Sequence, residues 1–314
     1  MLAVRNYRLF AGGQLVSLIG TWMQLTAQDW LVLQLGGGGL ALGAVLAVQF
    51  TPVLLLSLWA GVLADRYDKR RLLLATQLAM AVLSAALAVL VATRAISLPL
   101  LLVLAGLLGC ASALDVPVRQ SFVVEMVGPR LVSAAVALNS VTFNGARIIG
   151  PSVAGLMIAA VGTAPVLGIN VLSYVAVLAA LLAMRSGELQ PVPRVPREPG
   201  QLRAGLAYVR GRPELLLPIV LVGVVGTFGL NFPVTLALLA RRTFHGTAAT
   251  YGLLTSLVAL GSLAGAALAT RRPHPTPMLV TGAALAFGCA EAAAGLMPTL
   301  PLTGPCSWSP GPRC

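Results

Sequence analysis

The twelve residues GVLADRYDKRRL, numbered 61–72, join two long apolar runs. Gly61 lets two helices approach closely, because it brings no side chain to the contact. Asp65 stands near the end of the first run and can accept a hydrogen bond from a helix N-terminus or from an arginine. Basic residues follow at once, as is typical of the cytoplasmic ends of membrane helices. The stretch therefore predicts a short cytoplasmic turn between two helices that cross a membrane.

The composition of the whole chain agrees with this interpretation. Of 314 residues, 58% are hydrophobic and 10% are charged, and the mean hydropathy is +0.90. Soluble domains have about 45–50% apolar and about 25% charged residues, so a soluble globular protein is excluded. The formal net charge of +12 comes from basic clusters between apolar runs, without a basic groove interleaved with aromatic residues. No nucleic-acid partner is therefore expected.

Apolar runs long enough to cross a bilayer recur along the chain. A spanning helix needs roughly 20 mainly apolar residues. The first run predicts a permanent helix rather than a signal peptide, because it exceeds the roughly 7–15 apolar residues of a signal peptide. Nine runs satisfy the length criterion: 9–33, 41–64, 72–93, 98–116, 133–160, 164–184, 213–239, 248–270 and 276–297.

The basic residues of the loops predict the orientation in the membrane. Sixteen lysines and arginines fall on the side of the N-terminus and three on the opposite side. Because cytoplasmic loops retain Lys and Arg, the N-terminus is predicted to be cytoplasmic. The chain is therefore expected to be a multi-pass membrane protein, with the lipid bilayer as its surroundings.

A proline-rich stretch divides the chain into unequal parts. Four prolines lie between Pro191 and Pro199, and a basic amphipathic segment follows. An extended linker and a helix on the inner leaflet are favoured over a plain loop. The predicted fold class is all-α, a polytopic membrane helix bundle with four parts: a six-helix N-terminal half at 1–184, a cytoplasmic linker at 185–212, a partial three-helix C-terminal half at 213–297 and an irregular tail at 298–314.

The loop at 61–72 resembles the cytoplasmic signature of the major facilitator superfamily, which is Gly-x-Leu-x-Asp-Arg followed by a basic cluster. An ordinary basic turn is the simpler alternative, but Gly, Leu, Asp and Arg all stand at the family spacing. The resemblance implies a bundle of major-facilitator type, in which this loop locks one state of alternating access. It assigns Gly61, Asp65, Arg66, Lys69, Arg70 and Arg71 to the motif.

A second match lies in the predicted span at 133–160. Gly150, Pro151 and Gly155 resemble the Gly-Pro motif of the antiporters of the superfamily. The glycines offer a flat packing face, and the proline can bend the helix. The resemblance implies an exporter rather than an importer.

Three further stretches resemble one branch of the superfamily, the bacterial enterobactin exporters and transmembrane secretion effectors. They are RNYRLF at 5–10, QDWLVL at 28–33 and LDVPVRQ at 114–120. This resemblance implies a secondary active transporter that exports a siderophore-like or drug-like small molecule, in exchange for protons, across the bacterial inner membrane. The superfamily plan has twelve helices, so a chain with nine is expected to be truncated. The alternative is a non-transporting membrane protein or a half-transporter that assembles with a partner.

Ionisable residues inside apolar runs are candidate functional groups, because a charge in a membrane span is costly. Asp29 is the candidate for proton coupling, and an interfacial carboxylate beside Trp30 is the alternative. Arg147 could pair with an anionic substrate or form a structural contact, and Glu291 has no predicted partner. Polar amides could line a cavity or bond helix to helix; they are Gln24, Gln28, Gln49, Asn139, Asn144 and Asn170.

A second group of charges is predicted at the cytoplasmic ends of the helices. Asp115 lies near the end of the fourth apolar run and Arg119 and Glu125 follow it, on the same predicted side as the loop at 61–72. Opposite charges brought together there would form an inner gate. The resemblance implies that Asp65, Arg70 and Asp115 act as one network in it.

The sequence carries little sign of catalysis or of a bound cofactor. The two histidines, His245 and His274, are far apart in predicted loops and assemble no catalytic triad. The four cysteines show no metal-ligand spacing, and the chain shows neither a phosphate-binding glycine loop nor an ATP-binding domain. The predictions are therefore no enzyme activity, no cofactor and no metal.

Overall fold

The computed structural model describes residues 4–189 and 232–269, together with the single positions 208, 210–212, 216, 220, 282, 285 and 289. Most of the predicted linker helix and most of the runs at 213–239 and 276–297 lie outside the described residues, as do Glu291 and the tail at 298–314. So do the side chains of Asp65 and Arg66.

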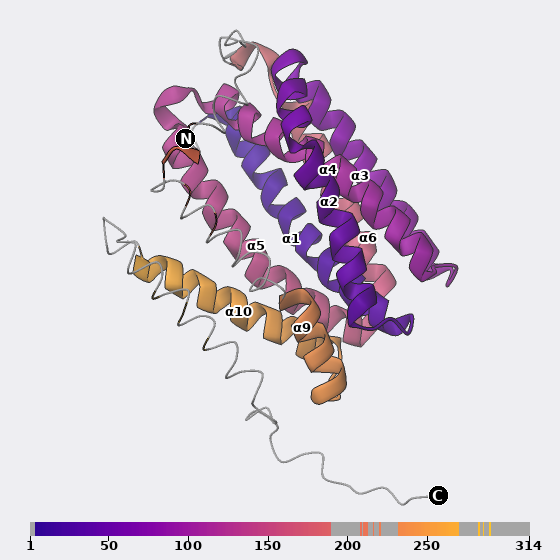
Figure 1. Cartoon of the computed structure of the whole chain (residues 1–314). Helices are drawn as coiled ribbons and strands as arrows, with labels where there is room; N and C mark the ends of the chain where they lie inside the picture. Colours follow the sequence, from indigo (N-terminus) through magenta and orange to yellow (C-terminus); the bar gives the residue numbers. More distant parts are fainter. Residues whose placement is uncertain are drawn as a thin grey trace, which may run out of the picture.

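Long helices account for most of the described chain, and no strand occurs in it (Figure 1). The all-helical bundle predicted from the sequence is confirmed. Short helical turns lie at Pro129–Leu131, Ser186–Glu188 and Leu239–Thr243, the last of them a π-helix labelled η4. The helices are α1 (Arg5–Gln34), α2 (Gly39–Arg66), α3 (Lys69–Ala92), α4 (Leu98–Val127), α5 (Val132–Val161), α6 (Thr163–Ala183), α9 (Phe232–Leu238) and α10 (Ala248–Ala269).

Local sequence explains where several helices begin and end. Asp68 caps α3, because its side chain accepts a hydrogen bond of 2.8 Å from the backbone N–H of Arg71. Gly128 and Gly162 end α4 and α5 with φ of 69° and 87°, a conformation that side chains disfavour. Prolines inside α2, α4 and α5 are tolerated as in other membrane helices, whose neighbours satisfy the freed backbone groups.

Six of the described helices are long and apolar enough to cross a membrane: α2, α3, α4, α5, α6 and α10. The 30-residue α1 is not among them, because polar side chains interrupt its apolar character. Gln14, Gln24, Gln28 and Asp29 are all buried. The neighbours of α1 thus shield polar groups that lipid would not accept.

The packing order of the helices brings the functional segments together. α1 packs against α5 and α6, α2 against α4, and α3 against α4 and α6. α10, which follows the predicted linker, packs along α5, so α5 lies between α1 and α10 (Figure 1). α5 therefore joins the first six helices to the described helix that comes after them.

Candidate functional site

A hydrogen bond between α1 and α10 joins side chains that are 222 positions apart in the sequence. The hydroxyl of Tyr251 donates to Oδ2 of Asp29 over 2.7 Å. Asp29 is 6% exposed and Tyr251 is 1% exposed. The predicted coupling residue therefore lies buried at a contact between helices from the two predicted halves, rather than at an open interface.

Two arginines surround this contact without pairing with Asp29. The guanidinium of Arg241 lies 5.6 Å from the ring centre of Trp30, which is within the range of a cation–π interaction. Arg242 approaches Gly38, where an added Cβ would lie 3.3 Å from its Nη2 atom. These contacts bring η4 against the end of α1 and the start of α2.

The Gly-Pro motif of α5 is packed on both sides. A Cβ added at Gly150 would lie 2.5 Å from Cβ of Trp22 in α1, and one added at Gly155 would lie 2.6 Å from the carbonyl oxygen of Ala248 in α10. The small residues thus let α1 and α10 approach α5 closely, which agrees with the flat packing face predicted for the two glycines. The side chain of Ser256 adds a polar contact, since it donates over 2.8 Å to the carbonyl oxygen of Ile148.

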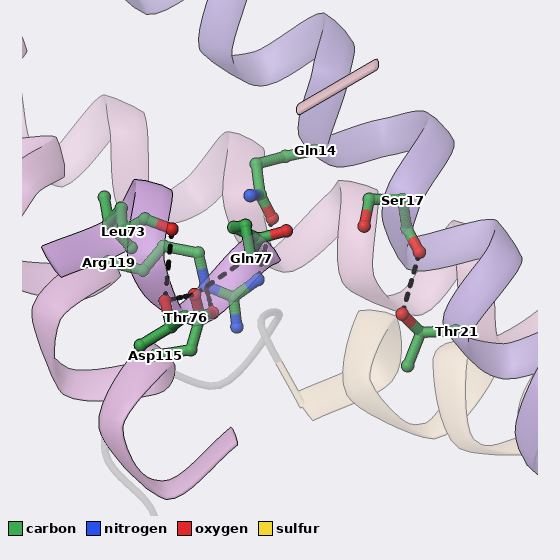
Figure 2. Close-up of polar contacts among 8 residues, drawn as sticks. All are labelled: Gln14, Ser17, Thr21, Leu73, Thr76, Gln77, Asp115 and Arg119. Carbon is green, nitrogen blue, oxygen red and sulfur yellow. Dashed lines mark hydrogen bonds and ion pairs between the residues drawn. The ribbon is translucent and has the colours of Figure 1, made fainter. Parts of the chain in front are cut away.

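Asp115 lies in a buried polar cluster of α1, α3 and α4 (Figure 2). Its Oδ1 accepts hydrogen bonds from Thr76 over 2.9 Å and from Gln77 over 2.8 Å. Its Oδ2 lies 3.6 Å from Nε of Arg119, whose Nη1 donates over 2.7 Å to Gln14. The predicted pair Asp115 and Arg119 is therefore brought together, with three polar partners that sequence reasoning missed.

Basic side chains of the predicted loop motif contact the ends of two other helices, α4 and α6. Lys69 forms an ion pair with Glu125 at the end of α4. Arg70 donates to the carbonyl oxygens of Leu181 and Leu182 at the end of α6, over 2.9 Å and 3.1 Å. The predicted single network of Asp65, Arg70 and Asp115 stays a prediction, because the side chain of Asp65 lies outside the described residues.

Arg147 lies in α5 with its guanidinium 5.9 Å from the ring centre of Trp22. The ring of Phe143 meets the same indole edge to face, with centres 5.7 Å apart and an angle of 70°. No carboxylate of the described residues lies within ion-pair distance of Arg147.

Two of the predicted cavity amides of α1 are buried and hydrogen-bonded, one of them to another helix. Asn170 of α6 donates to Gln24 over 2.7 Å, and Gln24 donates to Gln28 over 3.2 Å. Sequence reasoning missed Tyr251 altogether. One feature of the sequence could have pointed to Tyr251: it places an aromatic hydroxyl in the run at 248–270, whose other residues are small or aliphatic. In the described part of the chain, no group of three or more His, Cys, Asp or Glu side chains could hold a metal ion.

Comparison with known proteins adds independent findings. The transmembrane secretion effector family matches residues 2–305. The chain is 27% identical over 266 residues to the staphyloferrin A transporter of Staphylococcus aureus, which covers 82% of this chain and 64% of that protein. It is 28% identical to the multidrug efflux pump Tap of Mycolicibacterium fortuitum, over 90% of this chain and 71% of that protein.

The fold is also similar to that of a solved transporter. A bacterial homologue of the human lysosomal transporter Spinster, in an inward-facing and unoccupied conformation, superposes with a TM-score of 0.72 at 14% identity, over 95% of this chain and 70% of that one. The chain thus spans about two thirds of the length of these relatives. It belongs to the transmembrane secretion effector family of the major facilitator superfamily, whose members are membrane transporters and not enzymes.

Proposed function

We propose that this chain is a secondary active transporter that exports small molecules across the bacterial inner membrane in exchange for protons, by alternating access. The hydrogen bond between Asp29 and Tyr251 carries the proposal. It puts a buried carboxylate at the contact between helices from the two predicted halves. Two relatives support the substrate class, because their names describe siderophore transport and drug efflux.

The protonation state of Asp29 controls this contact for a physical reason. A charged carboxylate without a donor is costly in a low-dielectric interior, so the hydroxyl of Tyr251 stabilises the charged form. Once Asp29 takes up a proton, it no longer needs that donor, and α10 is held less firmly to α1. A proton thereby shifts the balance between two arrangements of the halves.

Several other ionisable side chains have contacts of their own and do not pair with the carboxylate of Asp29 as Tyr251 does. Arg241 makes a cation–π contact with Trp30, and Arg147 of α5 makes one with Trp22. Arg242 approaches Gly38, and Tyr174 of α6 lies deep in the first six helices. None of the arginines in the described ranges lies within 4.0 Å of Asp29. Within the described ranges, the hydrogen bond from Tyr251 is the one polar contact of the Asp29 side chain, and the proposed coupling rests on it.

Close glycine contacts and serine hydrogen bonds join α5 to α10. They involve residues 148–155 of α5 and residues 248–256 of α10.

The direct test of transport uses everted membrane vesicles, whose lumen corresponds to the outside of the cell. Vesicles with an acidic lumen and this chain should accumulate carboxyfluorescein or rhodamine 123, two dyes that share a xanthene ring but differ in charge. Collapse of the pH gradient with ammonium should release the dye. Equal dye uptake by vesicles without the chain would contradict the proposal.

Replacing Tyr251 by Phe tests the proposed coupling contact. The ring packing is kept, but Asp29 loses its donor, which should destabilise the chain by about 1–3 kcal/mol when Asp29 is charged. The loss should shrink as the pH falls, because a protonated carboxyl does not need the donor. Thermal unfolding of purified protein across pH measures the difference. Tyr174→Phe, at another buried tyrosine, is the control, and the same pH profile for both variants would contradict the coupling role.

We also propose that the loop at 61–72 is part of the inner gate, in which Lys69 and Glu125 hold the ends of α3 and α4 together. The pair is partly buried, with side chains 15% and 16% exposed. Lys69→Glu and Glu125→Lys should each cost about 1–2 kcal/mol of stability, between the values for exposed and buried pairs. The double exchange should recover most of the loss, as a double-mutant cycle of unfolding measures. Additive losses would show that the two side chains act independently.

A further inference from the structure

Among the described residues, the guanidinium of Arg147 has none of the charged or carbonyl partners that arginines in membrane spans usually have. It is half-buried in α5, and its one electrostatic contact with the described residues is a cation–π contact with Trp22, whose ring centre lies 5.9 Å from Cζ. Arg147 forms no hydrogen bond and no ion pair with the part of the chain that the structure describes. Arginines in spans face the bundle interior or a water-filled cavity and pair with a charge or with carbonyls. The contact with Trp22 leaves that requirement unmet.

A contact with an indole ring leaves a guanidinium able to bind an anion. A cation–π contact engages the charge of the guanidinium and not its N–H donors, which lie in the plane of the group. Two of these donors match the two oxygens of a carboxylate in a bidentate contact. Trp22 therefore orients Arg147 without using its hydrogen-bonding capacity.

The position of Arg147 on α5 places it between the two halves. A helix repeats every 3.6 residues, so Ser140, Asn144 and Arg147 share one face. Gly150 marks the side of α5 that packs on α1, and Gly155 marks the side that packs on α10. The polar face lies between these two sides, and α5 itself lies between α1 and α10 (Figure 1).

Aromatic and amide groups accompany the arginine on this part of α5. Phe143 is 43% exposed while its ring contacts Trp22, so a free aromatic surface remains beside the guanidinium. Asn144 is half-buried and donates over 2.8 Å to the carbonyl oxygen of Ser140, which leaves its side-chain oxygen free of described partners. The group thus offers one cation, two aromatic rings and an amide.

We propose that Arg147, Trp22 and Phe143 form the site that recognises the transported molecule, and that this molecule carries a carboxylate on a planar apolar body. The carboxylate binds the free edge of the guanidinium, and the planar body lies against the exposed ring of Phe143. The inference rests on the proposed function and names the substrate class for it.

Binding to the purified chain in detergent micelles tests the site independently of transport. Fluorescence anisotropy should show that anionic carboxyfluorescein binds more tightly than cationic rhodamine 123. Benzoate should displace the bound carboxyfluorescein, while benzamide, which has the same ring without the charge, should not. Equal displacement by benzoate and benzamide would overturn the proposal without the use of any variant.

Variants of the arginine supply the second arm of the experiment. Arg147→Gln should weaken carboxyfluorescein binding by about tenfold or more, which corresponds to the loss of a charge-assisted hydrogen bond. Arg147→Lys keeps the charge but not the bidentate geometry, so its affinity should be intermediate. Arg130→Gln, at an exposed arginine before α5, is the control for non-specific attraction to a basic protein. The same affinity for Arg147→Gln and Arg130→Gln would overturn the site.

The two proposals fail in different ways. Arginine-dependent binding of carboxyfluorescein without uptake by vesicles would contradict transport and support the site. Uptake of rhodamine 123 by a chain that is indifferent to benzoate would contradict the site and support transport. If Arg147→Gln loses its helical circular dichroism, the benzoate competition and Arg147→Lys decide the outcome.

Discussion

Replacing Asp29 by Asn is expected to abolish dye accumulation driven by a pH gradient, down to the level of vesicles that lack the chain. Asn has the shape of a permanently protonated Asp29 and still accepts the hydrogen bond from Tyr251. The fold should therefore persist, with the contact between α1 and α10 held in its weaker, neutral form, while no proton can be taken up or released. Downhill exchange of labelled for unlabelled dye should continue, because it requires no net movement of protons.

The measurement compares uphill accumulation and downhill exchange in the same vesicle preparation. Glu188→Gln is the control, because it removes an exposed acid that pairs with Arg185, beside the end of α1 that is opposite Asp29. That variant should match the unmodified chain in both assays. Accumulation by Asp29→Asn at the level of the unmodified chain would remove Asp29 from the coupling mechanism.

Replacing Gly155 by Ala is expected to separate α5 from α10 and destabilise the chain by about 1–3 kcal/mol, as overpacking does in other interiors. The added Cβ would lie 2.6 Å from the carbonyl oxygen of Ala248, and a backbone atom in a packed helix cannot move aside alone. The neighbouring contact between Tyr251 and Asp29 should weaken as well. Thermal unfolding in detergent measures the stability.

Gly145 on the same helix is the matched control for this substitution. No atom lies within 4 Å of a Cβ added there. Gly145→Ala should therefore leave stability unchanged or raise it by up to about 1 kcal/mol, since Ala favours a helix over Gly. If both variants unfold at the same temperature, the close approach of α5 and α10 does not contribute to stability.

The sequence predicted the class of the fold and most of its helices correctly. Apolar runs at 72–93 and 164–184 correspond to α3 and α6, because a membrane helix must be apolar over a fixed length. The motif at 61–72 indicated the superfamily through its resemblance to a known signature. Hydropathy predicts α1 less well. Its polar residues are buried by neighbouring helices, and the hydropathy of one segment carries no information about its neighbours.

Local pattern also anticipated part of the candidate site. The pair of Asp115 and Arg119 is one helical turn apart, so its proximity follows from the sequence. The small residues at Gly150 and Gly155 predicted close packing, but not which helix would approach each of them. Asp29 and Arg147 were recognised as costly charges in apolar runs, without knowledge of their contacts.

The sequence by itself determined an all-helical membrane protein, its superfamily and the charges that its spans must accommodate, because these depend on residue type and local spacing. Only the tertiary structure decided that Tyr251 donates to Asp29 and that Trp22 contacts Arg147. Membrane helices are similarly apolar, so hydropathy does not specify which faces meet. Partners that are 222 and 125 positions apart become neighbours through the packing of α5 between α1 and α10.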